Sequence, residues 1–271
     1  MTQGIHTISS EQYHASSGTS NSALKWIRSP KTPAHFKAKF LDKVIPDEET
    51  PALRMGSLLH RCVLEPDTMD GAFYERPEGM KFTTKDGIAW KEAHSDKPIL
   101  SPDDVATIKG VRDSIWAHPL ASRLIPGSDC ERSAFAGEDG LVLKSRFDIL
   151  PRSGNIIADL KTCESADLAS VEAAMGKWEY YVQAAFYLRV ANLLGLDRSA
   201  FVFIFVEKSP PYAVAVYQPC DLVMQAGEMI INRDLRVLKD CYASGKWPGY
   251  PQGINACGLP QFQMKQLEQL L

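Results

Sequence analysis

The chain has 271 residues, 45% of them hydrophobic, which is enough to bury a sizeable core as one domain with appendages. Its net charge of −3 and sequence pI of about 6.1 give no overall sign of nucleic-acid binding, because such domains often have a pI above ~9. A locally basic surface remains compatible with this balance, since the position of the charge matters more than its sum.

The cysteines and the apolar segments indicate the compartment. The six cysteines form no CxxC pair, and their spacing fits neither a zinc site nor a disulfide framework, so we expect free thiols in a reducing environment. The N-terminal residues lack the apolar stretch of a signal peptide, and the longest apolar run, 200–206, is too short to span a membrane. The sequence therefore predicts a soluble, cytoplasmic protein.

The first half of the chain is predicted to be mainly helical. Ser20 is a suitable N-cap for a short helix over 20–29, and Pro51 fits the first turn of a buried helix over 51–64. Residues 67–100 are rich in turns and contain a further helical stretch, and residues 102–118 are predicted to form another helix.

Residues 25–43 form a basic run, with six lysines and arginines against one aspartate. Such a run is most often a solvated helical face, and this is the interpretation that the sequence favours. A surface that faces phosphates is the functional alternative.

The second half alternates strands and helices, which indicates an α/β fold with a central mixed sheet flanked by helices. A helix over 165–195 is expected to break near Gly176. The predicted strands are 131–137, 140–150, 156–162, 200–208 and 212–219, and the further helices are 220–245 and 259–271.

The strand over 156–162, "IIADLKT", carries two charges within an apolar sequence. Because side chains alternate along a strand, Asp159 and Lys161 share one face. If the preceding turn centres on Ser153–Gly154, Asp148 falls directly opposite Asp159, with Cβ atoms ~5 Å apart. The hairpin therefore brings two carboxylates and an ammonium together.

These three groups are sufficient for metal-assisted phosphodiester hydrolysis. Two carboxylates this close repel each other, and a divalent cation such as Mg²⁺ or Mn²⁺ would remove the repulsion. Lys161 could then position or deprotonate a water, or stabilise charge that develops on a phosphate. An isolated Asp-x-Lys is usually an exposed ion pair, but the apolar neighbours and the opposed Asp148 favour a site.

Two helical pairs add to this set. Gln183 and Tyr187 are four residues apart and share a helix face, as do Gly56 and His60. A lone histidine in an apolar helix is more often part of a core than a ligand, and Gln and Tyr often hydrogen-bond within a core. Only the combination of these residues favours a site.

In this order, "GSLLH" (56–60), "RFDIL" (146–150), "ADLKT" (158–162) and "QAAFY" (183–187) resemble the motifs of the PD-(D/E)xK nuclease superfamily in its RecB-like branch. The pattern there is G-x-x-x-H, then Asp, then (D/E)-x-K, then Q-x-x-x-Y. Within the branch, the chain is most similar to RecE-like exodeoxyribonuclease VIII nuclease domains, over nearly its whole length. Each motif is weak alone, and together they are specific.

The resemblance implies a restriction-endonuclease-like core and a role for each motif residue. The implied metal ligands are His60, Asp148, Asp159 and the backbone carbonyl of Leu160. The implied catalytic residues are Lys161, which acts on the water, with Asp148, Asp159, and Gln183 and Tyr187, which support the site and contact the scissile strand. One nuclease domain over 1–271 is implied, with a mainly helical part carrying the histidine motif (1–125), a catalytic core (126–245) and a tail (246–271).

The resemblance also implies an activity and partners. Enzymes of this family digest linear double-stranded DNA from 5′ to 3′ with Mg²⁺, and Mn²⁺ is a possible substitute. They leave 3′ single strands for a RecT-type annealing protein, and they form ring-shaped homo-oligomers in phage recombination systems of bacterial cells. The alternatives are a RecB-like single-strand nuclease or endonuclease, and a non-catalytic DNA-binding module of the same fold.

Three further expectations concern individual residues. Some RecB-like relatives hold an iron–sulfur cluster with four cysteines, but Cys220, Cys241 and Cys257 lack the tight spacing it needs, so we expect none. Glu65 could bind a second metal through water, although a helix-end glutamate is usually solvated. Arg54 could meet a DNA phosphate, or equally be a surface arginine.

Overall fold

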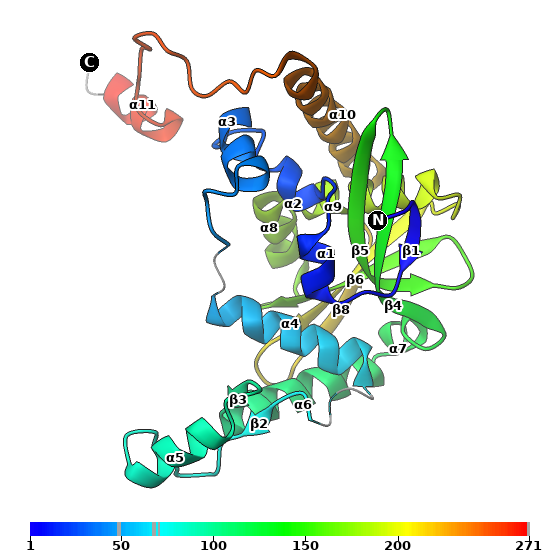
Figure 1. The fold of residues 1–271 in the computed structure, drawn as a ribbon, viewed down its shortest axis with the longest axis vertical. Coiled ribbons are helices and arrows are strands. Elements are labelled where there is room, and N and C mark those ends of the chain that lie inside the picture. The colour runs from blue at the N-terminus through cyan, green and yellow to red at the C-terminus, as the bar shows by residue number, and fades with distance from the viewer. Residues whose placement is uncertain (48–49, 67–68, 70, 270–271) are drawn as a thin grey trace.

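A computed structural model describes residues 1–47, 50–66, 69 and 71–269, and its centre is a six-stranded sheet (Figure 1). The strand order is β1-β4-β5-β6-β7-β8; β6 and β7 run parallel, and the other neighbouring pairs are antiparallel. The predicted α/β class with a mixed central sheet is confirmed. The strands are β1 (Gly4–His6), β4 (Ser128–Glu138), β5 (Leu141–Pro151), β6 (Ile156–Cys163), β7 (Ala200–Glu207) and β8 (Val214–Tyr217).

Helices cover both faces of the sheet and create two apolar layers. Along β6, Ile157 packs into one layer, whereas Ala158 and Leu160 pack into the other, as strand alternation requires. One layer includes α2 (Asn21–Leu24), α8 (Leu168–Trp178), α9 (Tyr180–Leu193) and α10 (Asp221–Ser244). The other includes α4 (Pro51–Leu64), α6 (Pro102–Ala117) and α7 (Ala121–Leu124).

The N-terminal segment is attached to the sheet by pairing and by a buried lysine. It contains β1, α1 (Ser10–Ala15), α3 (Pro33–Phe36) and a π-helical turn η1 (Lys37–Leu41), of which β1 pairs with β4. Lys144 on β5 is buried and donates to the carbonyls of Tyr13 and Ser16 at the end of α1, at 2.9 and 2.7 Å. A cation at this helix end satisfies carbonyls that have no partner within the helix.

Two segments extend from this body. Strands β2 (Tyr74–Glu75) and β3 (Ile99–Leu100) pair with each other, and with α5 (Lys85–Ala93) they form an arm at the lower left of the view (Figure 1). Helix α11 (Gln261–Glu268) follows a long irregular segment after α10 (Figure 1). Within the described part of the chain, no helix is long and apolar enough to cross a membrane. All six cysteines are described and are free.

Two elements differ from their prediction. The helix expected over 165–195 does divide, but at Glu179 rather than near Gly176, which lies within α8. Glu179 has a left-handed backbone, with φ of 56°. The helix expected over 20–29 is regular only as far as Leu24.

Candidate active site

The β5–β6 hairpin has the predicted register. Ile149 pairs with Ala158, which places Asp148 opposite Asp159. The backbone N–H of Leu160 donates to Asp148 Oδ2 at 3.0 Å, so this carboxylate takes a donor that would ordinarily belong to the strand ladder. The two aspartates are thereby held where β5 and β6 meet.

Asp159 is almost fully buried, with 1% of its side chain exposed. Gln183 Nε2 donates to Asp159 Oδ1 at 2.5 Å, and Lys161 forms an ion pair with Oδ2. Within the part of the chain that the structure describes, this ion pair with the Lys161 ammonium is the contact that compensates Oδ2 for its burial.

Lys161 lies against two aromatic rings. Its Nζ is 4.9 Å from the centre of the Tyr180 ring and 5.8 Å from that of Phe203. Burial acts to lower the pKa of Lys161, but Asp159 and Asp148 outweigh it and raise the pKa above its usual value. The side chain is therefore an ammonium at neutral pH.

His60 reaches the same place from α4. Its Nδ1 lies 3.3 Å from Asp148 Oδ2. Burial, and then the positive charge of Lys161, lower the pKa of His60, so the imidazole is neutral at pH 7 and able to ligate a metal. The Leu160 backbone lies close enough to hydrogen-bond to this imidazole, which puts the implied carbonyl ligand beside the implied histidine ligand.

Asp148 lies between His60 and Asp159. Burial, and then the negative charge of Asp159, raise the pKa of the Asp148 carboxyl well above its usual range. This is the electrostatic conflict expected of two carboxylates that share a site without a cation.

Glu131 on β4 is a site residue that the sequence analysis missed. One ligand atom each from His60, Glu131 and Asp148 lie within 4.8 Å of one another, and this group could hold a metal ion. Arg146 Nε donates to Glu131 Oε2 at 2.7 Å. Burial and the Asp148 charge raise the pKa of Glu131, while the hydrogen bond from Arg146 lowers it.

A sequence signal for Glu131 did exist. The β4–β5 hairpin turns at Asp139–Gly140, and Glu138 pairs with Leu141. An Asp-Gly turn between two strands predicts this register, and counting back along it places Glu131 opposite Asp148.

The donor set fits a divalent cation. The ligand atoms that lie within 4.8 Å of one another are those of one neutral imidazole, His60, and two carboxylates, Glu131 and Asp148. Asp159 is outside this group, opposite Asp148 on the next strand, where Lys161 and Gln183 hold it. An imidazole with carboxylates suits Mn²⁺ or Mg²⁺.

Gln183 and Tyr187 lie together on α9, as their spacing predicts. Tyr187 is close enough to hydrogen-bond to Gln183, and its ring packs edge-on against Phe147 and Phe201. Burial raises the pKa of the Tyr187 hydroxyl well above its usual value, so it remains protonated. The pair thus forms a rigid support beneath Asp159.

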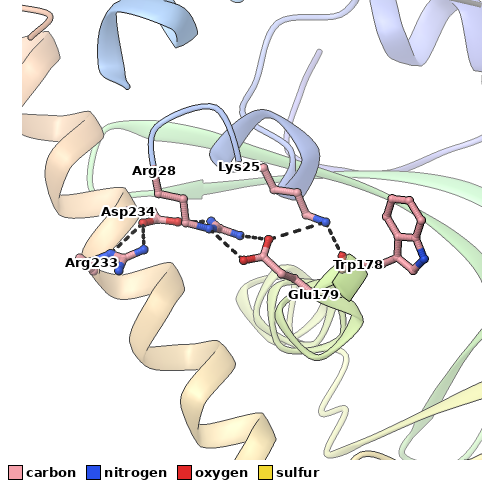
Figure 2. A network of polar contacts seen from close by, with 6 residues as sticks. All are labelled: Lys25, Arg28, Trp178, Glu179, Arg233 and Asp234. Carbon is pink, nitrogen blue, oxygen red and sulfur yellow. Dashed lines mark hydrogen bonds and ion pairs between the residues drawn. The ribbon is translucent and has the colours of Figure 1, made fainter. Parts of the chain in front are cut away.

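A polar network fixes the junction between α8 and α9 at Trp178 and Glu179 (Figure 2). Lys25 donates to the Trp178 carbonyl at 2.5 Å, and Arg28 donates to Glu179 Oε2 at 2.6 Å and also to Asp234 on α10. In the basic run, these two residues therefore stabilise the fold. Lys37 and Lys39 are paired with Asp42 and Asp47.

The remaining candidates on α4 lie around this centre. Arg54 is exposed, and an alanine-sized side chain at Gly56 would meet no atom within 4 Å. Glu65, just after α4, is half-buried, and its negative charge contributes to the raised pKa of Cys130, after burial, Glu131 and Asp148.

Comparison with known proteins agrees with this geometry. A family model described as a PDDEXK-like domain of unknown function (DUF3799) matches residues 20–260. The chain belongs to this PDDEXK-like family. The match includes every candidate site residue, from His60 to Tyr187.

One solved structure has a similar fold. A protein from Eubacterium rectale, provisionally named an exonuclease, is 14% identical, with a TM-score of 0.63 over 96% of this chain and 98% of that chain. At 14% identity, this likeness shows only that the two chains share a fold. SSO0001 is 13% identical, with a TM-score of 0.29 over 73% of this chain and 89% of that chain. A TM-score this low does not establish a shared fold. No curated protein matches.

Proposed function

We propose that this PDDEXK-like protein is a divalent-metal-dependent nuclease that digests linear double-stranded DNA from its ends. The observation that carries the proposal is the arrangement of Asp148, Asp159 and Lys161 at the junction of β5 and β6, with Gln183 holding Asp159. Buried carboxylates that crowd each other destabilise a protein unless a ligand uses them.

The residues that would hold the cation are His60, Asp148, Asp159 and the carbonyl of Leu160. When bound, Mg²⁺ or Mn²⁺ would supply Lewis-acid stabilisation of charge on the scissile phosphate. The neutral imidazole and the two carboxylates provide the hard and borderline donors that these ions accept.

The chain's other residues would act on the substrate and on the ligands. Lys161 presents an ammonium beside the carboxylates, where it would attract a phosphate oxygen and stabilise charge that develops there. Tyr180 and Phe203 limit the positions of this ammonium, and Gln183 orients Asp159 with help from Tyr187. These contacts would keep the reacting groups in one geometry before DNA binds.

Three points support a nuclease that acts on DNA ends, and the first of them alone bears on the duplex substrate and the 5′ to 3′ direction. The motifs resemble those of RecE-like enzymes, the chain belongs to a PDDEXK-like family, and the Eubacterium rectale protein of the same fold is provisionally named an exonuclease. By the same resemblance we propose a ring-shaped homo-oligomer around DNA, and a RecT-type annealing protein as the acceptor of the 3′ single strands.

One gel experiment tests the activity. Linear duplex labelled at the 5′ end or at the 3′ end, closed circular duplex and single-stranded DNA are incubated with the protein in Mg²⁺ or in EDTA. We expect early release of the 5′ label from linear duplex only, and no digestion in EDTA. Asp159→Ala should be inactive with an unchanged fold.

Each alternative gives a different gel. Cutting of closed circles would indicate an endonuclease, and preference for single strands would indicate a RecB-like activity. DNA binding without cleavage in either Mg²⁺ or Mn²⁺ would indicate a non-catalytic module. Normal digestion by Asp159→Ala would show that the site is misplaced.

A further inference from the structure

Three carboxylates lie in a row across three adjacent strands. The register of β4 and β5 places Glu131 opposite Asp148, and the register of β5 and β6 places Asp148 opposite Asp159. The outer member, Glu131, has no part in the motifs from which the site was predicted. Its position next to His60 and Asp148 therefore requires its own explanation.

The backbone of Glu131 is unusual for a residue within a strand. Its φ is 53°, in the left-handed region that a non-glycine residue seldom adopts. The ladder is regular on both sides, since Cys130 pairs with Ile149 and Arg132 pairs with Phe147. A local distortion inside a regular ladder redirects one side chain, and such distortions are common beside active sites.

Arg146 fixes the carboxylate of Glu131 after the backbone has turned it. Its Nε donates to Glu131 Oε2 at 2.7 Å, and its Nη1 donates at 3.0 Å both to Ser133 Oγ and to the carbonyl of Ile8. The guanidinium therefore has anchors on β4 and on the N-terminal segment. In this arrangement Arg146 is a positioning residue for Glu131.

An ion pair that only stabilises the fold would not need this arrangement. Glu138, on the same strand, binds Arg189 through both carboxylate oxygens and has no left-handed backbone. Glu131 is instead brought to within 4.8 Å of ligand atoms of His60 and Asp148, where it repels a second carboxylate. A cation between these groups would turn the repulsion into attraction.

We infer that Glu131 is a further protein ligand of the divalent ion and that it makes the site favour Mn²⁺ over Mg²⁺. The inference rests on the proposed metal site. Mg²⁺ keeps several waters and is usually held by one or two carboxylates. Glu131 would raise the proposed ligand set of His60, Asp148 and Asp159 to three carboxylates and an imidazole, which leaves fewer positions for water and is better matched to Mn²⁺. Glu131 would thus set which ion the enzyme uses.

The test measures metal binding without DNA. Calorimetric titration with MnCl₂ and with MgCl₂ is carried out on the unaltered protein, on Glu131→Gln, and on Glu138→Gln as the matched control. We expect Glu131→Gln to weaken Mn²⁺ binding by about ten-fold or more, by analogy with the loss of other groups around metal sites. The loss for Mg²⁺ should be smaller, and the control should bind both ions as the unaltered protein does.

A second readout separates ligation from a structural role. Water-proton relaxation counts the waters on bound Mn²⁺, and removal of a protein ligand should add about one water. If Glu131→Gln is too unstable to use, Glu131→Asp keeps the charge and withdraws the carboxylate, with the same expected direction. Unchanged Mn²⁺ affinity and water number in a folded Glu131 variant would overturn the inference.

Failure of this inference differs from failure of the proposed function. A protein that cuts DNA while Glu131→Gln binds both ions normally would refute the ligand assignment alone. A protein that binds Mn²⁺ through Glu131 but cuts no DNA would refute the nuclease activity alone.

Discussion

Asp234 on α10 and Asp159 on β6 are equally buried, with 1% of each side chain exposed, and each is paired with a cation. Asp234 has every oxygen satisfied: Arg28 donates to Oδ2, and Arg233 donates twice to Oδ1, at 3.1 and 2.9 Å (Figure 2). Asp159 is held by Gln183 at Oδ1 and by Lys161 at Oδ2, but it lies beside a second carboxylate, that of Asp148.

The difference separates a structural ion pair from a functional one. Both carboxylates lose hydration on burial, but the contacts of Asp234 with Arg28 and Arg233 replace what water provided. The contacts of Asp159 with Gln183 and Lys161 do the same, but they leave its repulsion with Asp148 in place. Burial therefore does not distinguish the two roles, whereas like-charge crowding does.

The largest expected effect is the loss of digestion in Asp159→Asn. The amide keeps the volume and can still accept from Gln183, but it removes the negative charge that a divalent ion needs. We expect DNA digestion to fall by about 10³-fold or more, equivalent to ~4 kcal/mol in the activation barrier. The substitution breaks the ion pair with Lys161, but it also relieves the repulsion with Asp148, which remains beside Lys161, so we expect a smaller loss of stability than for Asp234→Ala. A large drop in the midpoint of urea unfolding would show that Asp159, too, is a structural residue.

Asp234→Ala should give the opposite result. Removal of this carboxylate leaves Arg28 and Arg233 without a shared acceptor, although Arg28 keeps Glu179. We expect a loss of about 2–3 kcal/mol in the free energy of unfolding, below the full cost of breaking a buried pair, measured by urea denaturation. Mn²⁺ affinity at a temperature where the variant is folded should be unchanged. Weaker Mn²⁺ binding there would indicate that the network in Figure 2 acts on the site.

Gly227→Ala tests the contact that joins the two regions, since α9 carries Gln183 and α10 carries Asp234. A Cβ at Gly227 would lie 2.8 Å from the Tyr181 carbonyl oxygen, which is backbone and cannot move aside cheaply. We expect a loss of about 1–3 kcal/mol in the free energy of unfolding. Gly176→Ala on α8 is the control, because its Cβ would meet nothing within 4 Å and the substitution should be neutral or slightly stabilising. Equal stability of the two variants would argue against close packing of α9 on α10.

The sequence predicted the part of the site that depends on local pattern and simple register. The β5–β6 hairpin has its turn residues in the centre, so the opposition of Asp148 and Asp159 followed by counting. The bounds 51–64 of the helix that carries His60 were also predicted, because a proline begins the helix and its body is apolar.

What the sequence did not predict depends on contacts between distant segments. The left-handed backbone of Glu131 has no signal in a residue type that rarely adopts it, and Arg146 supports it from the next strand. The break at Glu179 is held by Lys25 and Arg28, more than 150 positions away. Strand β1 is three residues long, too short for alternation to be recognised.

A last prediction concerns the pH dependence of the metal-free protein and extends the contrast to a third aspartate, Asp148. Its folded-state pKa is raised to about 8, chiefly by burial and then by Asp159, so between about pH 4 and pH 8 the folded state binds more protons there than the unfolded state does. Stability from this group must therefore fall as pH rises through that window.

In EDTA, the free energy of unfolding of the unaltered protein, relative to Asp148→Asn, should decrease from pH 5 to pH 8 by a few tenths to about 1 kcal/mol per pH unit. His60 has a lowered pKa and contributes the opposite slope in both proteins, so the difference between them is the quantity to measure. Saturating Mn²⁺ should abolish or reverse the decrease, because the ion binds the ionised carboxylate and displaces the proton. A difference that does not vary with pH in EDTA would mean that Asp148 is as well compensated as Asp234, and the distinction between the two ion pairs would lose its electrostatic basis.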